Sequence, residues 1–293
     1  MISGAAARSL TWPAAGPRSA LLRGRRELNI LPTRPFQARG FLAIVMVAAL
    51  APAVAAHAQQ AASAITGSLV ERELPKDGGT RRITIYTPPG YAEAADRWVI
   101  YLSDGQGVPD FAATLEPLML RGRLPRAMLV GLWNDPPVRA KEYLPGFAGG
   151  GALHGAYDRF VMSAVVPFAE RELGAPARAD RRVVAGVSDG ASWALDAAAR
   201  HRREIAHVIA LSPGWSPVLP YVANSPSQTV FLGYGEREPQ SGGLARAIGR
   251  QAQKDDARVC VRAEPGGHEM AAWRPLMADA LAWLGGTLKC SGP

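Results

Sequence analysis

The stretch VVAGVSDGAS, residues 183–192, carries most of the information about the fold. Its β-branched residues lead into Gly186-Val187-Ser188-Asp189-Gly190, and the helix-forming run ASWALDAAAR follows from residue 191. A serine in the pattern G-x-S-x-G, with a strand before it and a helix after it, is typical of a tight turn that exposes a nucleophilic hydroxyl. The short pattern also occurs in ordinary turns, so its meaning depends on the rest of the chain.

The rest of the chain alternates between strand-like and helix-like segments. Strands are predicted at 68–74, 82–88, 98–103, 127–133, 182–187, 207–212, 229–235 and 257–263. Apolar residues keep helical spacing within 157–173 and again within 273–284. This alternation predicts a mostly parallel sheet with helices on both faces, preceded by two antiparallel edge strands. With the serine turn, it indicates an α/β-hydrolase fold built as a single domain over residues 59–293.

The first 58 residues have the features of an export signal. Arg34 and Arg39 precede the uncharged apolar run FLAIVMVAALAPAVAA, and Ala56-His57-Ala58 follows as a small-residue cleavage pattern. A transmembrane anchor is the alternative, but the run is shorter than the about 20 residues that a span needs, and Pro52 interrupts it. We therefore expect cleavage near Ala58, no stable membrane insertion afterwards, and a periplasmic or secreted protein.

The formal charge of +8 is concentrated in this leader. Residues 1–58 contain seven arginines and one acid, Glu27, so they account for +6 and leave +2 for the remaining chain. A basic excess in a leader is not a nucleic-acid-binding surface, and no nucleic-acid partner is expected.

Cys260 and Cys290 are the two cysteines of the chain. In an oxidising compartment such a pair can form a disulfide, and two unrelated thiols are the alternative. Neither cysteine has the spacing of a metal site, and histidines are few. The sequence therefore predicts neither a metal nor another cofactor.

A nucleophilic serine needs an acid and a histidine, which in this fold follow it in the order serine, acid, histidine. His268 lies in a glycine-rich loop after the last predicted strand, and it is the histidine in the expected position. The acid is expected after the strand 229–235, where Glu236 and Glu238 are both candidates.

Two main-chain N–H groups are candidates for stabilising an oxyanion. The N–H of Asp189 directly follows the serine, and the N–H of Gln106 lies in the loop SDGQG after the strand 98–103. The side chain of Asp189 argues against catalysis, because a negative charge close to a developing oxyanion is unfavourable unless it points to solvent.

The segment 134–155 is rich in proline and glycine and is longer than a typical connection, so we expect a loop that lines a cleft. Arg139 in this loop, His154 at its end and Trp215 after the strand 207–212 are the candidate contacts for a small-molecule substrate. Trp193, within the helix after Ser188, is expected to belong to the core.

Several further segments follow one another in an order typical of one family. They are VIYLSDGQ (99–106), VGLWND (130–135), RAKEYLP (139–145), LSPGWSP (211–217), GYGEREP (233–239) and GGHEMAAWRPLMADALAWL (266–284). Together with GVSDGASWAL (186–195), they resemble the esterase-D-like, enterochelin-esterase-like family of α/β-hydrolases over about residues 80–285.

This resemblance implies roles for particular residues: Ser188 as nucleophile, His268 as base, Glu238 as acid with Glu236 as the fallback, and the N–H groups of Gln106 and Asp189 as oxyanion donors. Family members commonly have Met, Phe or Asn after the serine, where this chain has Asp189. That departure bears on the reaction rate more than on the fold.

The expected function is that of an exported serine esterase that hydrolyses a carboxylic ester through an acyl-enzyme. A siderophore lactone, a hydroxycinnamoyl ester and an acylated sugar are all compatible substrates. The alternatives are an acyltransferase with the same residues and a non-catalytic binding protein on a hydrolase scaffold.

Overall fold

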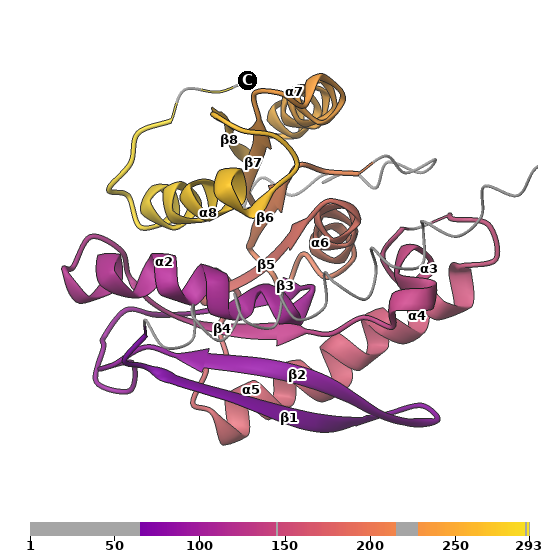
Figure 1. Ribbon diagram of the computed structural model, residues 1–293, viewed down its shortest axis with the longest axis vertical. Helices are drawn as coiled ribbons and strands as arrows, with labels where there is room; N and C mark the ends of the chain where they lie inside the picture. The colour runs from indigo at the N-terminus through magenta and orange to yellow at the C-terminus, as the bar shows by residue number, and fades with distance from the viewer. Residues whose placement is uncertain (1–64, 145, 215–227, 291, 293) are drawn as a thin grey trace, which may run out of the picture. The chain divides into compact units, whose positions relative to one another are not determined.

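The computed structural model describes residues 65–144, 146–214, 228–290 and 292 (Figure 1). The predicted leader, residues 1–58, lies outside these residues. None of the helices in the described part of the chain combines the length and the apolar character needed to cross a membrane.

An eight-stranded sheet forms the centre of the described chain. Its strands are β1 (Ser68–Lys76), β2 (Gly79–Thr87), β3 (Arg97–Ser103), β4 (Arg126–Leu132), β5 (Arg182–Val187), β6 (His207–Leu211), β7 (Thr229–Gly235) and β8 (Arg258–Glu264). They lie in the order β1-β2-β4-β3-β5-β6-β7-β8, with β1 and β2 antiparallel and the others parallel. The strand predictions and the two antiparallel edge strands are confirmed.

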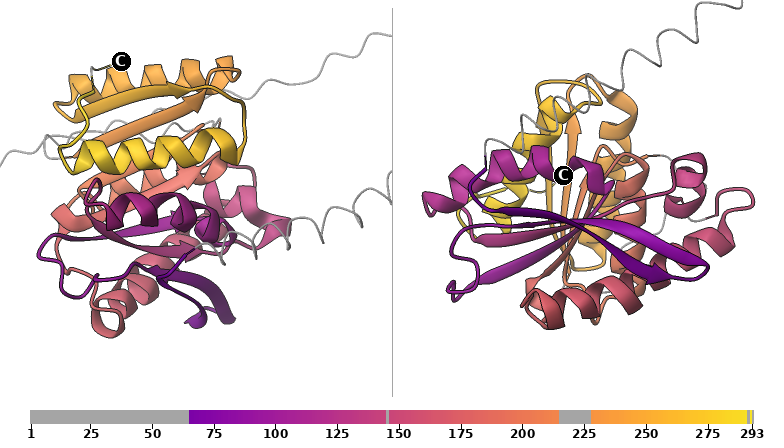
Figure 2. Two further views of the ribbon diagram at one scale, coloured as in Figure 1. Left: turned by 60° about the vertical axis from the view of Figure 1, so that its left-hand side comes forward. Right: turned by 60° about the horizontal axis from the view of Figure 1, so that its bottom comes forward.

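Helices cover both faces of this sheet, as the figures show (Figures 1 and 2). They are α2 (Val108–Leu120), α3 (Arg139–Tyr143), α4 (Gly151–Phe160), α5 (Val166–Glu172), α6 (Asp189–Arg200), α7 (Pro239–Lys254) and α8 (Met270–Leu284). α2 and α8 pack on one face, and α4 to α7 pack on the other. Alternate strand residues point to opposite faces, so Tyr101 joins one core and Leu102 the other.

The segment 134–155 is not the long loop that its composition predicts. It contains a 3-10 turn (Pro136–Val138), the helix α3 and the start of α4, which begins six residues before the helix expected from Tyr157. Tyr143, His154 and Tyr157 are buried in these helices. Tertiary packing of such side chains stabilises helices whose sequence contains glycines and is otherwise unfavourable.

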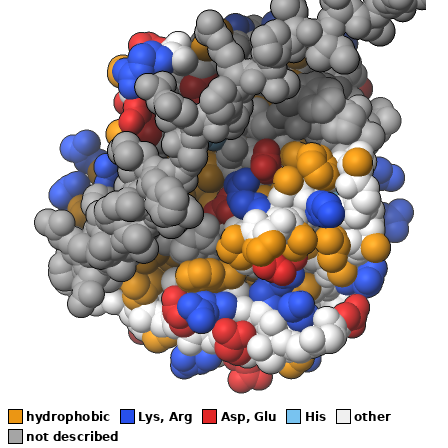
Figure 3. Space-filling view, turned by 45° about the vertical axis from the view of Figure 1, so that its right-hand side comes forward, with side chains coloured by type: hydrophobic (Ala, Val, Ile, Leu, Met, Phe, Trp, Pro, Cys, Tyr) orange, Lys and Arg blue, Asp and Glu red, His pale blue; other side chains and the backbone are white. Residues whose placement is uncertain are grey.

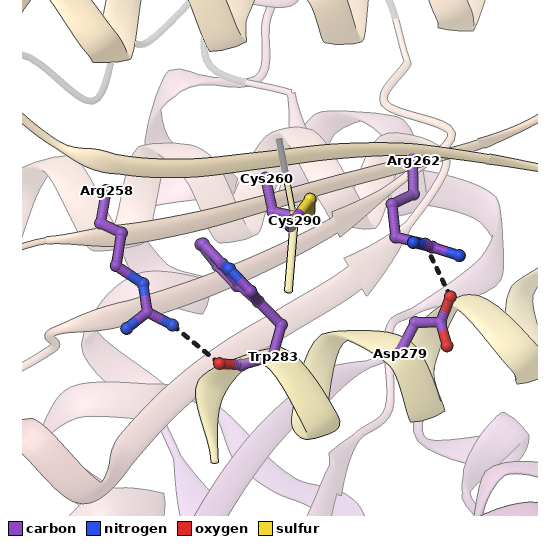
Figure 4. The surroundings of a disulfide bond; sticks show 6 residues. All are labelled: Arg258, Cys260, Arg262, Asp279, Trp283 and Cys290. Carbon is purple, nitrogen blue, oxygen red and sulfur yellow. Dashed lines mark hydrogen bonds and ion pairs between the residues drawn. A yellow bond between two sulfur atoms is a disulfide. The ribbon is translucent and has the colours of Figure 1, made fainter. Parts of the chain in front are cut away.

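A disulfide joins Cys260 on β8 to Cys290 after α8, with the two Cα atoms 5.6 Å apart. The open question about the cysteine pair is therefore settled in favour of a disulfide. Figure 4 shows it between two contacts that also connect β8 and α8. Arg258 donates to the carbonyl oxygen of Trp283 at 2.7 Å, and Arg262 forms an ion pair with Asp279 at 2.7 Å.

Candidate active site

Backbone strain is concentrated at one edge of the sheet. Asp104, Ser188 and Ser212 directly follow β3, β5 and β6, and their φ angles are 56°, 57° and 47°. Residues other than glycine rarely adopt positive φ, and each such residue costs of order 1–3 kcal/mol. Because β3, β5 and β6 are parallel, all three strained residues lie at the carboxyl edge of the sheet. Ligands of open α/β sheets bind at this edge.

Ser188 occupies the turn between β5 and α6 that the sequence predicts. Its N–H donates to the carbonyl oxygen of Leu211 at 2.9 Å, and its carbonyl oxygen accepts from the N–H of Gly214 at 3.1 Å. These bonds tie the serine to the end of β6 and the residues after it. The main chain around Ser188 is therefore held in its strained conformation on both sides.

The glycines that flank Ser188 are required by close packing. A Cβ atom at Gly186 would lie 2.1 Å from the carbonyl oxygen of Gly190, and a Cβ at Gly190 would lie 2.0 Å from the hydroxyl of Ser103. Neither position has space for a side chain. The structure thus confirms the tight strand-to-helix turn inferred from G-x-S-x-G.

A carboxylate and an imidazole meet at the same edge. Glu238 follows β7 at the start of α7, and its Oε1 lies 2.5 Å from Nδ1 of His268, which precedes α8. Glu238 is 8% exposed, whereas Glu236 is exposed to solvent. Of the two candidate acids, the structure brings Glu238 to the histidine.

Two further groups hold the carboxylate of Glu238. Its Oε2 accepts from the hydroxyl of Ser212 at 2.6 Å and from the N–H of Gly235 at 2.9 Å. Burial acts to raise the pKa of Glu238, but the hydrogen bonds from Ser212, His268 and Gly235 outweigh it and keep the pKa below its ordinary value. The side chain is therefore a carboxylate at neutral pH.

Ser212 is fixed in turn by Trp273 on α8. The indole Nε1–H donates to the hydroxyl oxygen of Ser212 at 2.8 Å, so the serine proton is directed at Glu238. The Trp273 ring also meets the ring of His268 edge-on, with their centroids 4.9 Å apart. Neither residue has a role that the sequence alone predicts, although Ser212 lies in the segment LSPGWSP and Trp273 in the final helix.

The two candidate oxyanion donors follow two neighbouring strands, β3 and β5. Asp189 is the first residue of α6, and main-chain N–H groups in a first helical turn lack intrahelical partners. Gln106 lies in the 3-10 turn Gly105–Gly107 after β3, with its side chain exposed. A Cβ at Gly105 would lie 2.8 Å from the carbonyl oxygen of Gly131, so this turn packs closely on β4.

Arg139 lies between two carboxylates. Its Nε and one terminal nitrogen bind the two oxygens of Asp104 at 2.8 and 2.9 Å, and the other terminal nitrogen binds Asp189 at 2.9 Å. The hydrogen bond to Asp104 raises the pKa of Arg139 despite its partial burial. Arg139, which the sequence predicts to contact the substrate, thus binds the side chain of one candidate donor residue, Asp189. It also binds Asp104, two residues before the other candidate, Gln106.

His154 lies on α4 and is buried, with its ring nitrogens in contact with α3 and α6. Its Nδ1 lies 2.8 Å from the carbonyl oxygen of Glu142, and its Nε2 lies 2.8 Å from a carboxylate oxygen of Asp196. Both ring nitrogens are thus engaged within the protein, which does not fit the predicted substrate contact. Trp193 is buried, as expected, and Trp215 lies outside the described residues.

A family model described as "Putative esterase" matches residues 76–284. The chain belongs to this esterase family. It is therefore a carboxylic ester hydrolase, and the resemblance inferred from its motifs is confirmed. No curated protein sequence matches the esterase.

The solved structures that are similar to the esterase in fold include other esterases and a serine hydrolase. A ferulic acid esterase is 15% identical with a TM-score of 0.58, and the match covers 76% of this chain and 99% of that chain. The enterobactin esterase of Shigella flexneri in the presence of enterobactin is 23% identical with a TM-score of 0.64, covering 75% of this chain and 60% of that chain. An IroE-like serine hydrolase from Shewanella oneidensis is 19% identical with a TM-score of 0.62, covering 74% and 79%.

The surface on the side of α3 and α4 carries side chains of both signs. In the view that brings this side forward, basic and acidic side chains are interspersed with apolar ones over the described surface (Figure 3). Phe147, between α3 and α4, is one of the large apolar side chains exposed to solvent.

Proposed function

We propose that Ser188, His268 and Glu238 act as the catalytic triad of an exported serine esterase. Ser188 Oγ attacks the ester carbonyl while His268 Nε2 accepts its proton, and the imidazolium then donates that proton to the leaving alcohol. Water hydrolyses the acyl-enzyme by the same steps in the second half-reaction. The observation that carries this proposal is the 2.5 Å contact between Glu238 and His268 at the edge where Ser188 adopts its strained turn.

Glu238 would serve to orient and charge-balance the histidine. Its bond to Nδ1 places the reactive Nε2 on the opposite side of the ring, and its negative charge stabilises the imidazolium that forms during the reaction. The lowered pKa of Glu238 supports this role, because an ionised acid is required.

The main-chain N–H groups of Asp189 and Gln106 would donate to the oxyanion. The carboxylate of Asp189, which argues for a non-catalytic protein when the sequence is considered alone, is paired with Arg139. That pairing removes the main physical objection to catalysis at Ser188.

The substrate belongs to one of three ester classes: a siderophore lactone, a hydroxycinnamoyl ester or an acylated sugar. Two of the similar structures are named enterobactin esterase and ferulic acid esterase, which supports the first two classes. A panel of one ester from each class, compared by kcat/KM, would distinguish them.

Export through the leader 1–58 is part of the same proposal. The disulfide between Cys260 and Cys290 supports it, since disulfides persist in oxidising compartments and are rare in the cytosol. Amino-terminal sequencing of the protein recovered from the cell envelope or the medium should read from residue 59. An intact amino terminus in the cytosol would contradict export.

The triad is tested by labelling the processed protein with a fluorophosphonate and measuring its intact mass. One adduct is expected on the wild type and none on Ser188→Ala or His268→Ala. Glu238→Gln should lower kcat by about 10²- to 10⁴-fold. The matched control is Glu236→Gln, which changes an exposed glutamate two residues away and should leave kcat unchanged. Absence of any adduct on folded wild-type protein would refute the proposal.

A further inference from the structure

Arg139 is bound to the residues that carry the two proposed oxyanion donors. Asp189 supplies one donor through its own N–H, and its carboxylate oxygen lies 2.9 Å from a terminal nitrogen of Arg139. Asp104 lies two residues before Gln106, which supplies the other donor, and it binds Arg139 through both carboxylate oxygens. A single guanidinium group therefore connects the loop after β3 with the first turn of α6.

The Asp104 side of this connection is rigid. Asp104 adopts positive φ, its N–H donates to the hydroxyl of Tyr143 at 2.9 Å, and its carbonyl oxygen accepts from the N–H of Gly107 at 2.8 Å. Asn134 also donates to its Oδ1 at 2.6 Å. These bonds hold the main chain and the carboxylate of Asp104 in place at the start of the turn that contains Gln106.

The Asp189 side is confined as well. A Cβ atom at Gly214 would lie 2.6 Å from Oδ1 of Asp189, so the main chain after β6 packs against this carboxylate. The guanidinium of Arg139 lies over the ring of Tyr143, 5.0 Å from its centroid. The arginine is thus packed as well as hydrogen-bonded.

We propose that Arg139 is a positioning residue that sets the spacing of the two oxyanion donors and neutralises the carboxylate of Asp189. This inference rests on the proposed function, because it requires Ser188 to generate an oxyanion at that place. An uncompensated carboxylate there would oppose the developing negative charge, and a shift of either donor would weaken its hydrogen bond in the transition state. Both effects act on the transition state and not on the bound ester.

The test is a double-mutant cycle between Arg139 and Asp189, read out as kcat and KM on a small aryl ester. Arg139→Met should lower kcat by about 10- to 100-fold with little change in KM. In the Asp189→Asn background, where the carboxylate charge is gone, the same substitution should cost at least about fivefold less. Arg139→Lys, which keeps the charge but not the planar fork, should give a kcat between those of the wild type and Arg139→Met.

Arg262→Met is the matched control. Arg262 forms an ion pair with Asp279, and the side-chain exposures of 35% and 29% are close to the 28% and 27% of Arg139 and Asp189 (Figure 4). The Arg262→Met substitution should leave kcat unchanged. Thermal unfolding of each variant identifies any that fail to fold, and Arg139→Lys then carries the comparison.

Equal losses from Arg139→Met in both backgrounds would overturn the inference, because they would show that Arg139 acts independently of Asp189. A rise in KM with unchanged kcat would overturn it in favour of a direct substrate contact. Retained activity in Ser188→Ala would refute the proposed function itself, and the inference would fail with it. Failure of the cycle alone, with Ser188→Ala inactive, leaves the triad intact.

Discussion

Ser212 connects Glu238 and Trp273 in the candidate site through two hydrogen bonds. Ser212→Ala tests how much these bonds contribute to the free energy of unfolding. The substitution removes the 2.6 Å bond to the carboxylate of Glu238 and leaves the indole N–H of Trp273 without its 2.8 Å partner. A hydrogen bond to a charged group contributes about 1.5–3 kcal/mol, and an unsatisfied buried donor costs about 1–3 kcal/mol. With partial relief by an entering water, we expect the free energy of unfolding to fall by about 2–4 kcal/mol.

Ser241→Ala is the matched control, because Ser241 donates to the same carboxylate at the much longer distance of 3.4 Å. Its loss should cost well under about 1 kcal/mol. Urea unfolding followed by circular dichroism measures both variants. The positive φ of Ser212 is retained in alanine, so backbone strain does not enter the comparison. An equal decrease in the free energy of unfolding in the two variants would refute the stabilising role assigned to the hydrogen bonds of Ser212.

The same variant has a defined pH dependence. The folded-state pKa of Glu238 lies below its ordinary value of 4.5, so its contribution to stability is present above that value and is lost as pH falls through the folded pKa. Ser212→Ala removes one of the bonds that lower this pKa. The stability difference between variant and wild type should therefore be largest near neutral pH and should shrink in acid. A difference that does not shrink as pH falls through the folded-state pKa of Glu238 would contradict the assigned hydrogen bond.

Two other predictions concern the disulfide and the glycine packing that surround the site. Replacing Cys260 and Cys290 together by serine should lower the free energy of unfolding by about 3–4 kcal/mol, because the disulfide closes a loop over a sequence separation of 30; a melting temperature unaffected by the double substitution would contradict this. Gly190→Ala should abolish labelling of Ser188 and destabilise the protein, since its Cβ would lie 2.0 Å from the hydroxyl of Ser103. Gly243→Ala in α7 should instead stabilise the protein by about 0.5–1 kcal/mol, because an added Cβ would meet no atom within 4 Å outside its own helix backbone. Similar thermal unfolding of both alanine variants would refute the packing argument.

The strand pattern and the serine turn could be predicted from the sequence because both are local. Parallel strands buried on both faces consist of short apolar runs, and β3 to β7 are of this kind. The turn at Ser188 needs glycines at Gly186 and Gly190, and such a requirement is visible in the letters themselves. The order serine, acid, histidine follows from the connectivity of the fold.

The segment 134–155 shows where local reasoning fails. Its prolines and glycines predict a loop, but Tyr143, His154 and Tyr157 are buried against the sheet and α6, and their packing produces helices. The same burial engages both ring nitrogens of His154. Composition describes the preference of the isolated chain, whereas contacts with distant elements determine which conformation is most stable.

By itself, the sequence determined the α/β architecture, the family, the candidate nucleophile and the candidate histidine. The family resemblance favoured Glu238 over Glu236, and the tertiary structure placed Glu238 against His268. The structure alone joined Cys260 to Cys290 and placed Ser212 and Trp273 behind the acid. It also turned Arg139 from a candidate substrate contact into the partner of Asp104 and Asp189. The physical reason is that these choices depend on which side chains from separate strand ends come within hydrogen-bonding distance. That distance is a property of the assembled sheet and is not encoded in any one segment.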